Sequence, residues 1–261
     1  MLHQFSRTEL AIGPEGLDVM RGSTVAVLGI GGVGSIAAEA LARTGVGRII
    51  LVDKDVVDIT NINRQIHALT TTVGQPKAEL MRDRIKLINP ECDAIALRMF
   101  YTEETYEQFF SYPLDYVLDA SDTISYKIHL IQQCLERKIP IISSMGAANK
   151  MDPTKFQVAD ISQTSMDPIA RVVRQRLRKA GIKKGVKVVY SMEEPMKPRE
   201  DVTQRIVPEN APEIRKAQQP PASNAFVPPV AGLIMVSVAV RDLLDKAAKS
   251  DKSGNSGNSE V

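Results

Sequence analysis

A glycine-rich loop, Gly29-Ile30-Gly31-Gly32-Val33-Gly34, follows a run of β-branched residues and precedes a helical pattern. At such a junction, backbone amides and the positive end of the helix dipole point to one place, which favours a phosphate group. The candidate nucleotide ligands in this loop are its four glycines, Gly29, Gly31, Gly32 and Gly34. A turn that needs glycine only for structural reasons is the alternative.

Asp53 stands at the end of the next apolar run. An acidic side chain there can accept hydrogen bonds from ribose hydroxyls. The glycine loop and Asp53 together predict nucleotide binding of the Rossmann type, and on these two features alone NAD is the expected ligand.

Short apolar runs alternate with helical stretches through the first half of the chain. We predict strands at residues 24–28, 48–52, 94–99, 115–118 and 139–143, and helices at 33–44, 76–88 and 123–137. This alternation predicts an α/β, Rossmann-like nucleotide-binding fold with a mostly parallel central sheet and helices on both faces. Such a sheet gathers the glycine loop and Asp53 at its carboxyl edge.

After Met145 the pattern loosens, with strands expected at residues 156–159 and 186–190 and a basic helix at 168–180. We expect these strands to extend the sheet as antiparallel C-terminal strands. Residues 192–221 contain six prolines and many charges, so they predict a long irregular crossover loop. We therefore predict one domain over residues 1–248, with a nucleotide-binding half (20–145), a substrate-side half (146–248) and a disordered tail (249–261).

The composition is that of an ordinary globular protein: 261 residues, 43% hydrophobic and 25% charged, which is enough for one large core or two small ones. Lysine and arginine total 33 against 31 acidic residues. The net charge of +2 gives no global attraction to nucleic acid, so such binding would need a local basic patch.

The cysteine content and the apolar segments bear on location. Cys92 and Cys134 alone cannot form a disulfide framework or a four-cysteine zinc site, which favours a reducing, cytoplasmic setting. The polar N-terminus has no secretory signal pattern. Residues 230–240 are uncharged but far short of the roughly 20 residues that cross a bilayer, so we expect a buried helix and no stable membrane insertion.

Downstream of Asp53 the chain has Asn61-Ile62-Asn63-Arg64-Gln65 and then Gly74-Gln75-Pro76-Lys77. With the glycine loop, this ordered set resembles the ubiquitin-activating and ThiF/MoeB superfamily, in which a loop with Asn and Arg and a Lys on the next helix surround a triphosphate. The resemblance changes the expected ligand from NAD to ATP. It implies ATP-binding roles for the residues of this segment, Asp53, Asp55, Asn61, Arg64, Gln65 and Lys77.

Arg64 and Lys77 have the chemistry that adenylation needs. Attack of a carboxylate on the α-phosphorus of ATP builds negative charge on phosphate oxygens, and fixed cations stabilise it. Arg64 can contact phosphate oxygens in a bidentate manner and Lys77 supplies a point charge, so we predict both as catalytic. Surface salt bridges are the alternative for these two, and capping of a turn is the alternative for Asn61.

Asp119-Ala120-Ser121-Asp122 ends the fourth predicted strand, at the edge where ligands of such sheets bind. In the resembled superfamily the second acid of this motif binds the metal, which implies that Asp122 is a catalytic Mg²⁺ ligand and that Asp119 contacts loop backbone. A helix N-cap is the alternative for Asp122. Thr123 stands where the sulfur-carrier activators of the superfamily usually have asparagine.

Phe5-Ser6-Arg7 resembles the family segment whose arginine crosses a two-fold axis into the partner's active site. The resemblance implies a homodimer and makes Arg7 a catalytic candidate. A simple surface arginine is the alternative.

The cysteines help to separate the branches of the superfamily. An enzyme that forms a thioester with a ubiquitin-like protein needs an exposed nucleophilic thiol. Cys134 falls inside an apolar helical pattern and Cys92 at a helix-to-strand turn, and both positions favour a structural role. The paired-cysteine zinc site common in ThiF and MoeB proteins cannot form from these two cysteines.

The second half carries a more specific resemblance, in Gly146 to Thr154, in Val158-Ala159-Asp160, in Asp167 to Arg171 and in Ser223 to Pro228. These motifs are similar to the TcdA (CsdL) family of tRNA threonylcarbamoyladenosine dehydratases, and the similarity extends over roughly residues 5 to 245. Ala148 departs from an expected glycine. The resemblance implies ATP-dependent activation of the threonyl carboxylate on tRNA, followed by ring closure without a protein nucleophile.

A tRNA substrate agrees with residues 171–187, which hold eight basic residues and no acidic one. Such a strip can neutralise backbone phosphates, and three- and four-residue spacing places the candidate tRNA ligands on one helical face: Arg171, Arg174 and Arg178. A solvated helix face is the alternative. The resemblance also implies a bound monovalent cation and a sulfur-transfer partner protein, but no residue of this sequence identifies a site for either.

Two other functions are weighed against the dehydratase. One is ThiF/MoeB-like adenylation of the C-terminus of a ubiquitin-like sulfur-carrier protein. The other is a non-catalytic nucleotide-sensing module.

Overall fold

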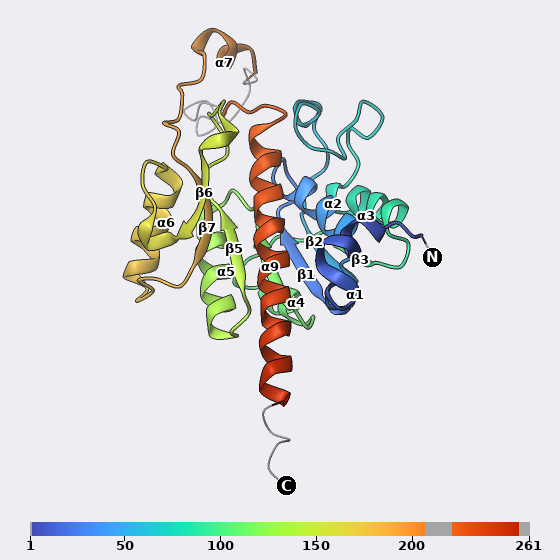
Figure 1. The fold of residues 1–261 in the computed structure, drawn as a ribbon. Helices are drawn as coiled ribbons and strands as arrows, with labels where there is room; N and C mark the ends of the chain where they lie inside the picture. Colours follow the sequence, from blue (N-terminus) through green and yellow to red (C-terminus); the bar gives the residue numbers. More distant parts are fainter. Residues whose placement is uncertain (1, 207–220, 256–261) are drawn as a thin grey trace.

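The computed structural model describes residues 2–206 and 221–255 of the chain. Its centre is a seven-stranded sheet in the order β3-β2-β1-β4-β5-β7-β6, with helices on both faces (Figure 1). The predicted α/β, mostly parallel fold is therefore confirmed.

Most of the first half follows the predicted alternation, because four of its five strands are short apolar runs that are buried almost throughout, while the edge strand Asp93–Leu97 is partly buried. The observed elements are β1 Thr24–Leu28, α2 Gly34–Thr44, β2 Arg48–Val52, η1 Ile59–Asn61, α3 Lys77–Ile88, β3 Asp93–Leu97, α4 Tyr106–Phe110, β4 Tyr116–Asp119, α5 Ile124–Glu136 and β5 Ile141–Ser144. All the pairings among these five strands are parallel. β1 lies between β2 and β4, so the chain changes direction across the sheet at β1.

The second half extends the same sheet, as predicted. Its elements are η2 Pro153–Lys155, β6 Phe156–Asp160, η3 Ile161–Gln163, α6 Pro168–Lys179 and β7 Lys187–Ser191. β7 pairs with β5 in parallel and β6 pairs with β7 in antiparallel orientation, so only β6 runs against the sheet. The predicted extension of the sheet by antiparallel C-terminal strands is confirmed in the β6–β7 pair.

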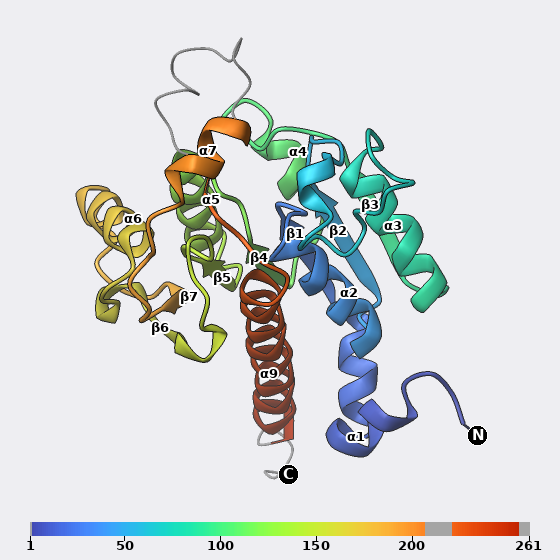
Figure 2. The same cartoon turned by 90° about the horizontal axis from the view of Figure 1, so that it is seen from above.

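Alternate side chains of each strand enter two hydrophobic clusters, one on each face of the sheet. Val25 and Val27 of β1 join the cluster with α2, α3 and the C-terminal helix α9, Val227–Asn255. Ala26 and Leu28 join the cluster with α4, α5 and α6 on the other face. Figure 2 shows the sheet between these two layers. Packing on both faces of β1 therefore fixes the end of the strand from which the glycine loop begins.

Helix α9 packs on α1, α2, β4, β5 and β7, which confirms the expected buried helix. Gly232 permits this packing, because a Cβ there would collide with the carbonyl oxygen of Val33 at the end of the glycine loop. An 18-residue stretch within Val227–Lys249 has a mean hydropathy of 1.7, and half of that stretch is buried in the protein, so by length and composition alone the helix could cross a membrane. It is longer than the apolar segment recognised in the sequence.

Three α-helices among the described residues were not predicted: α1 Ser6–Gly22, α4 and α7 Glu200–Ile206. α7 lies within the segment predicted as an irregular loop, and residues 207–220 of that segment lie outside the described residues. α9 continues to Asn255, so disorder was the wrong prediction for residues 249–255. Residues 256–261 of the predicted tail lie outside the described residues.

Candidate active site

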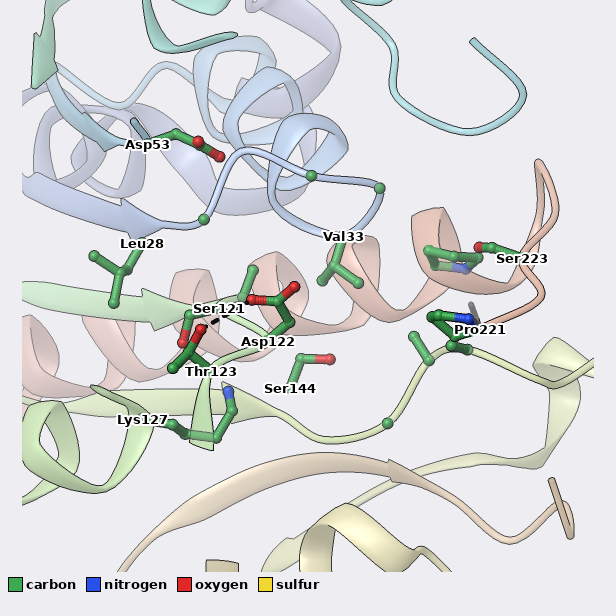
Figure 3. A pocket seen from close by; sticks show the side chains of 18 of the residues that line it. Leu28, Val33, Asp53, Ser121, Asp122, Thr123, Lys127, Ser144, Pro221 and Ser223 are labelled. Carbon is green, nitrogen blue, oxygen red and sulfur yellow. Dashed lines mark hydrogen bonds between the residues drawn. The ribbon is translucent and has the colours of Figure 1, made fainter. Parts of the chain in front are cut away.

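A cavity of about 660 Å³ opens at the carboxyl ends of β1, β2, β4 and β5, where the strand order changes direction. This is the position at which open α/β sheets bind ligands. Figure 3 shows Asp53 on one side of the glycine loop, Asp122 and Lys127 on the other, and Ser223 on the far wall. The cavity therefore has a nucleotide side near β2 and an acceptor side beyond β4 and β5.

The glycines of the loop have different roles. Gly29 has a φ of 86°, and a Cβ on it would lie 2.8 Å from the carbonyl oxygen of Ala120. Gly31 and Gly32 line the cavity with Gly29, and a Cβ on Gly31 would meet only Gln65 at 4.0 Å. Gly34 does not line the cavity. A Cβ on Gly34 would collide with the carbonyl oxygen of Gly29, so glycine at this position lets α2 begin directly against the loop backbone. Gly29, Gly31 and Gly32 thus line the cavity and Gly34 shapes the loop, and phosphate binding by these glycines stays a prediction.

Asp53 holds the loop in place. Its Oδ2 accepts the amide hydrogen of Ile30 at 2.7 Å, and its Oδ1 accepts that of Asp55 at 2.8 Å. Burial raises the pKa of the Asp53 carboxyl, and these hydrogen bonds and the Lys77 charge oppose that shift. Each oxygen of the Asp53 carboxylate has a second lone pair, so it can also accept a hydrogen bond from a ribose hydroxyl. The ribose contact stays a prediction. Asp55 also lines the cavity, 3.7 Å from the Lys77 ammonium.

Asn61 both caps a turn and lines the cavity. Its Oδ1 accepts the amide hydrogen of Asp58 at 3.1 Å in a capping box, so the capping alternative is realised. Gln65 is 5% exposed and also lines the cavity, and its Oε1 has no hydrogen-bond partner among the described residues. A buried unpaired oxygen is costly, so the cavity favours a ligand that donates a hydrogen bond to Gln65.

Arg64 and Lys77 meet in the cavity lining, as predicted. Nη1 of Arg64 donates to the carbonyl oxygen of Thr60 and to Oδ1 of Asn63, both at 2.9 Å. No carboxylate lies within ion-pair distance of Arg64 in the described part of the chain, which excludes the salt-bridge alternative there. Burial lowers the pKa of the Arg64 guanidinium. Lys77 is 7% exposed at the start of α3.

Below the nucleotide side, Asp119 forms a buried cluster with Lys127 and Ser143. Lys127 Nζ donates to Asp119 Oδ2 at 2.7 Å and to Ser143 Oγ at 3.1 Å. Asp119 Oδ1 accepts from the amide and the hydroxyl of Ser121, which confirms the expected backbone contact. Lys127 was not predicted from the sequence as part of the site. Its signal was helical spacing, because Lys127 shares the inward face of α5 with Leu130, Ile131 and Cys134.

Asp122 is exposed at the cavity, directly after this cluster. The N-cap residue of α5 is Thr123, so the capping alternative for Asp122 is wrong. Thr123 Oγ1 donates to Asp122 Oδ1 at 3.3 Å. The described residues contain no group of three metal-ligating side chains. Asp122 fits a Mg²⁺ ion that takes one carboxylate from the protein and its other ligands from phosphates and water.

The acceptor side is formed by the loop Gly146 to Lys150 and the start of α6. Lys150 and Asp167 form a buried ion pair there, with Nζ 3.0 Å from Oδ2, and Nζ also donates to the carbonyl oxygen of Gly146. Asp167 Oδ1 caps α6 by accepting the amide hydrogen of Ala170 at 2.9 Å. This pair, also missed from the sequence, joins the loop to the basic helix.

The remaining predicted residues lie outside the cavity. Arg7 is exposed on α1 and does not line the cavity of its own chain. Arg171 and Arg178 are exposed on α6. Arg174 is half-buried and donates to the carbonyl oxygen of Thr164 at 2.7 Å, which ties it to the protein. Arg171 and Arg178 are thus freer to contact a ligand than Arg174.

Neither cysteine suits nucleophilic catalysis. Cys92 and Cys134 are both fully buried. Burial raises the pKa of the Cys92 thiol to about 11 and raises that of Cys134 further. The reactive form of a cysteine is the thiolate, so the expected structural role is confirmed.

Comparison with known proteins gives consistent matches along the chain. The ThiF family model matches residues 5–256. The tRNA threonylcarbamoyladenosine dehydratase of Bacillus subtilis is 70% identical over 244 residues, which are 94% of this chain and 96% of that protein. The dehydratase of Escherichia coli is 39% identical over 255 residues, which are 94% of this chain and 95% of the relative.

The fold agrees with these matches. The crystal structure of the E. coli dehydratase, TcdA, in complex with ATP superposes with a TM-score of 0.83 at 38% identity, covering 94% of this chain and 96% of that one. The same protein has also been solved in complex with AMP. The chain belongs to the ThiF family, within the branch of the tRNA threonylcarbamoyladenosine dehydratases.

Proposed function

We propose that the chain is an ATP-dependent tRNA threonylcarbamoyladenosine dehydratase. The observation that carries this is one continuous cavity in which Arg64 and Lys77 on the nucleotide side face an open acceptor side. Two relatives that the chain matches over nearly their whole length carry this name, and the E. coli one has been solved with ATP and with AMP.

In the reaction, the threonyl carboxylate of the tRNA side chain attacks the α-phosphorus of ATP and pyrophosphate leaves. The carbamoyl nitrogen of the same side chain then attacks the acyl carbon. Its N–H bond breaks, a C–N bond closes the hydantoin ring, and AMP leaves with the former carboxylate oxygen. The sum is the loss of one water from the nucleoside, and no protein nucleophile takes part.

The residues of the cavity serve the first of these steps. Arg64 and Lys77 stabilise the charge that develops on the phosphate oxygens. The amides of the glycine loop bind phosphate at the N-terminus of α2. We infer that Asp122 holds Mg²⁺, which when bound would neutralise part of the triphosphate charge. Asp119, Lys127 and Ser143 fix the turn that carries Asp122.

The basic strip after Asp167 supplies the surface for tRNA. α6 begins at the acceptor side of the cavity with Pro168 and exposes Arg171 and Arg178 along its length, and the turn after it exposes Lys183 and Lys184. Positive side chains at such a position neutralise backbone phosphates while the modified base enters the cavity. We also propose that the chain acts in the cytoplasm as a homodimer in which Arg7 of one copy completes the site of the other. A monovalent cation and a sulfur-transfer partner remain proposals from the family.

The substrate on which ATP turnover depends distinguishes a tRNA dehydratase from an activator of a sulfur-carrier protein. We expect ATP–pyrophosphate exchange and AMP release to require tRNA that carries threonylcarbamoyladenosine. Unmodified tRNA is the matched control and should support neither. Exchange that depends instead on the C-terminal glycine of a ubiquitin-like sulfur-carrier protein would assign the site to carrier activation.

A further inference from the structure

On the acceptor side, Asn149 is bonded to two segments that are distant in sequence. Its amide donates to the carbonyl oxygen of Ala222 at 2.8 Å, and its Oδ1 accepts the amide hydrogen of Ala222 at 2.7 Å. Its carbonyl oxygen accepts the amide hydrogen of Met196 at 2.8 Å. Asn149 therefore holds residue 222 with both its backbone and its side chain.

On the nucleotide side, Asn63 holds the next residue of the same segment. Nδ2 of Asn63 donates to the carbonyl oxygen of Ser223 at 3.0 Å. Oδ1 of the same side chain accepts from Nη1 of Arg64 at 2.9 Å. Residues 222–224 thus lie between the loop of Asn149 and the arginine that faces the phosphates, and Asn224 Nδ2 adds a bond to the carbonyl oxygen of Lys150 at 2.8 Å.

The backbone of Asn149 has a conformation that few residues adopt. Its φ is 60°, in the left-handed region, where asparagine is one of the tolerated non-glycine residues. Asn63 is exposed and does not line the cavity, so a direct contact with the nucleotide does not explain its two hydrogen bonds. Both asparagines have side chains that serve to connect segments of the cavity wall.

We propose that Asn63 and Asn149 are positioning residues that act together through residues 222–224 to set the guanidinium of Arg64. The acceptor-side loop and the phosphate-binding arginine then form one unit, and Lys150 with Asp167 links this unit to the start of α6. The proposal rests on the proposed function in one respect, the contact of Arg64 with nucleotide phosphate.

Two substitutions remove single bonds of this connection. Asn149→Gly keeps the left-handed backbone and the amide bond to Ala222 but loses the Oδ1 acceptor. Asn63→Asp keeps an Oδ1 for Arg64 but places a carboxylate oxygen against the Ser223 carbonyl in place of the donor. Lys138→Gly is the matched control, because Lys138 also has a positive φ, 55°, and does not line the cavity.

The test is a double-mutant cycle on the dissociation constant of a non-hydrolysable ATP analogue, measured with Mg²⁺ and without tRNA. Loss of one connecting bond should weaken binding about fivefold in each single variant. The double variant should be no weaker than the more affected single variant, because both substitutions break the same connection. Lys138→Gly should bind within about twofold of the wild type.

Several outcomes would overturn the proposal. One is wild-type affinity in either single variant, and another is a double variant weakened about 25-fold, as independent effects would multiply. If Asn149→Gly does not fold, the exposed variant Asn63→Asp decides alone. If Arg64→Ala itself leaves the dissociation constant unchanged, the phosphate contact in the proposed function is wrong, and the positioning role is wrong with it. If Arg64→Ala weakens binding and the asparagine variants do not, only the positioning role is wrong.

Discussion

The ammonium nitrogen of Lys127 lies 2.7 Å from Oδ2 of Asp119, and both side chains are buried in the floor of the cavity. Ser143 Oγ donates to the same carboxylate oxygen at 2.6 Å. The other carboxylate oxygen holds the backbone and hydroxyl of Ser121. This pair therefore connects the sheet to the turn that presents Asp122 to the cavity.

Removal of Lys127 should destabilise the protein strongly. Lys127→Met leaves the Asp119 carboxylate buried without its cation, a change that costs about 3–5 kcal/mol. Urea denaturation measures the loss, and adding Asp119→Asn should recover part of it because the buried charge is then gone. The surface pair Arg82 and Asp83 gives the control, since Arg82→Met should cost about 0–1 kcal/mol. Similar small losses at both sites would contradict a buried ion pair.

Loss of Arg64 should reduce catalysis while leaving the fold intact. Arg64→Ala removes a fixed charge beside the phosphates, which typically lowers the rate by about 10²–10³-fold. Arg64→Lys keeps the positive charge but loses the planar guanidinium, so its kcat/KM should lie between those of the wild type and Arg64→Ala. The measurement is kcat/KM for dehydration, with Arg82→Ala on α3 as the control for loss of a positive charge. Wild-type kcat/KM in Arg64→Ala would exclude its phosphate contact.

Asp122 should govern the need for magnesium. Asp122→Asn keeps the shape of an exposed side chain but weakens the only carboxylate that the 119–122 turn offers to the cavity, because Asp119 is buried with Lys127. The concentration of Mg²⁺ that gives half-maximal activity should rise at least about tenfold. Asp83→Asn, an exposed aspartate on α3, should leave it unchanged. An unaltered Mg²⁺ requirement in Asp122→Asn would place the metal elsewhere.

The basic residues of α6 should contribute unequally to tRNA binding. Arg171→Ala and Arg178→Ala should each reduce the slope of log K against log salt by about one, as expected for a lost phosphate contact. Arg174→Ala should instead lower thermal stability, because Arg174 is bonded to Thr164. Filter binding at several salt concentrations measures the slope. Arg21→Ala, which removes an exposed arginine on α1, is the control. If Arg171→Ala and Arg178→Ala had the same slope as Arg174→Ala and this control, α6 would be excluded as the tRNA surface.

Local sequence patterns were sufficient to predict the parallel strands of the first half and the residues on the nucleotide side of the cavity. β1, β2, β4 and β5 are short apolar runs buried on both faces of the sheet. The glycine loop, Arg64 and Lys77 lie in segments whose residue types and spacing have a direct chemical reason. The five-residue helix α4 was missed because so short an element has no measurable periodicity. The end of α9 was misplaced because its polar residues continue a helix begun in the core.

Contacts between distant segments could not be predicted from the sequence. Asn149 meets Ala222, and Lys150 meets Asp167, only because β5, β7 and the start of α9 converge at one edge of the sheet. The parallel orientation of β7 depends in the same way on how the chain returns after α6. Lys127 was overlooked because a lysine in a helix suggests solvent, whereas the buried Asp119 gives it a partner.

The central claim is loss of one water from a nucleoside on tRNA, and mass spectrometry measures it directly. The protein is incubated with Mg²⁺, ATP and tRNA that carries threonylcarbamoyladenosine, and the nucleosides are then released under mild conditions and weighed. We expect the modified nucleoside to become lighter by one water, about 18 mass units, with one AMP formed per nucleoside, no change when ATP is omitted and a much slower change with Arg64→Ala. An unchanged nucleoside mass in the complete wild-type reaction would contradict the dehydratase function.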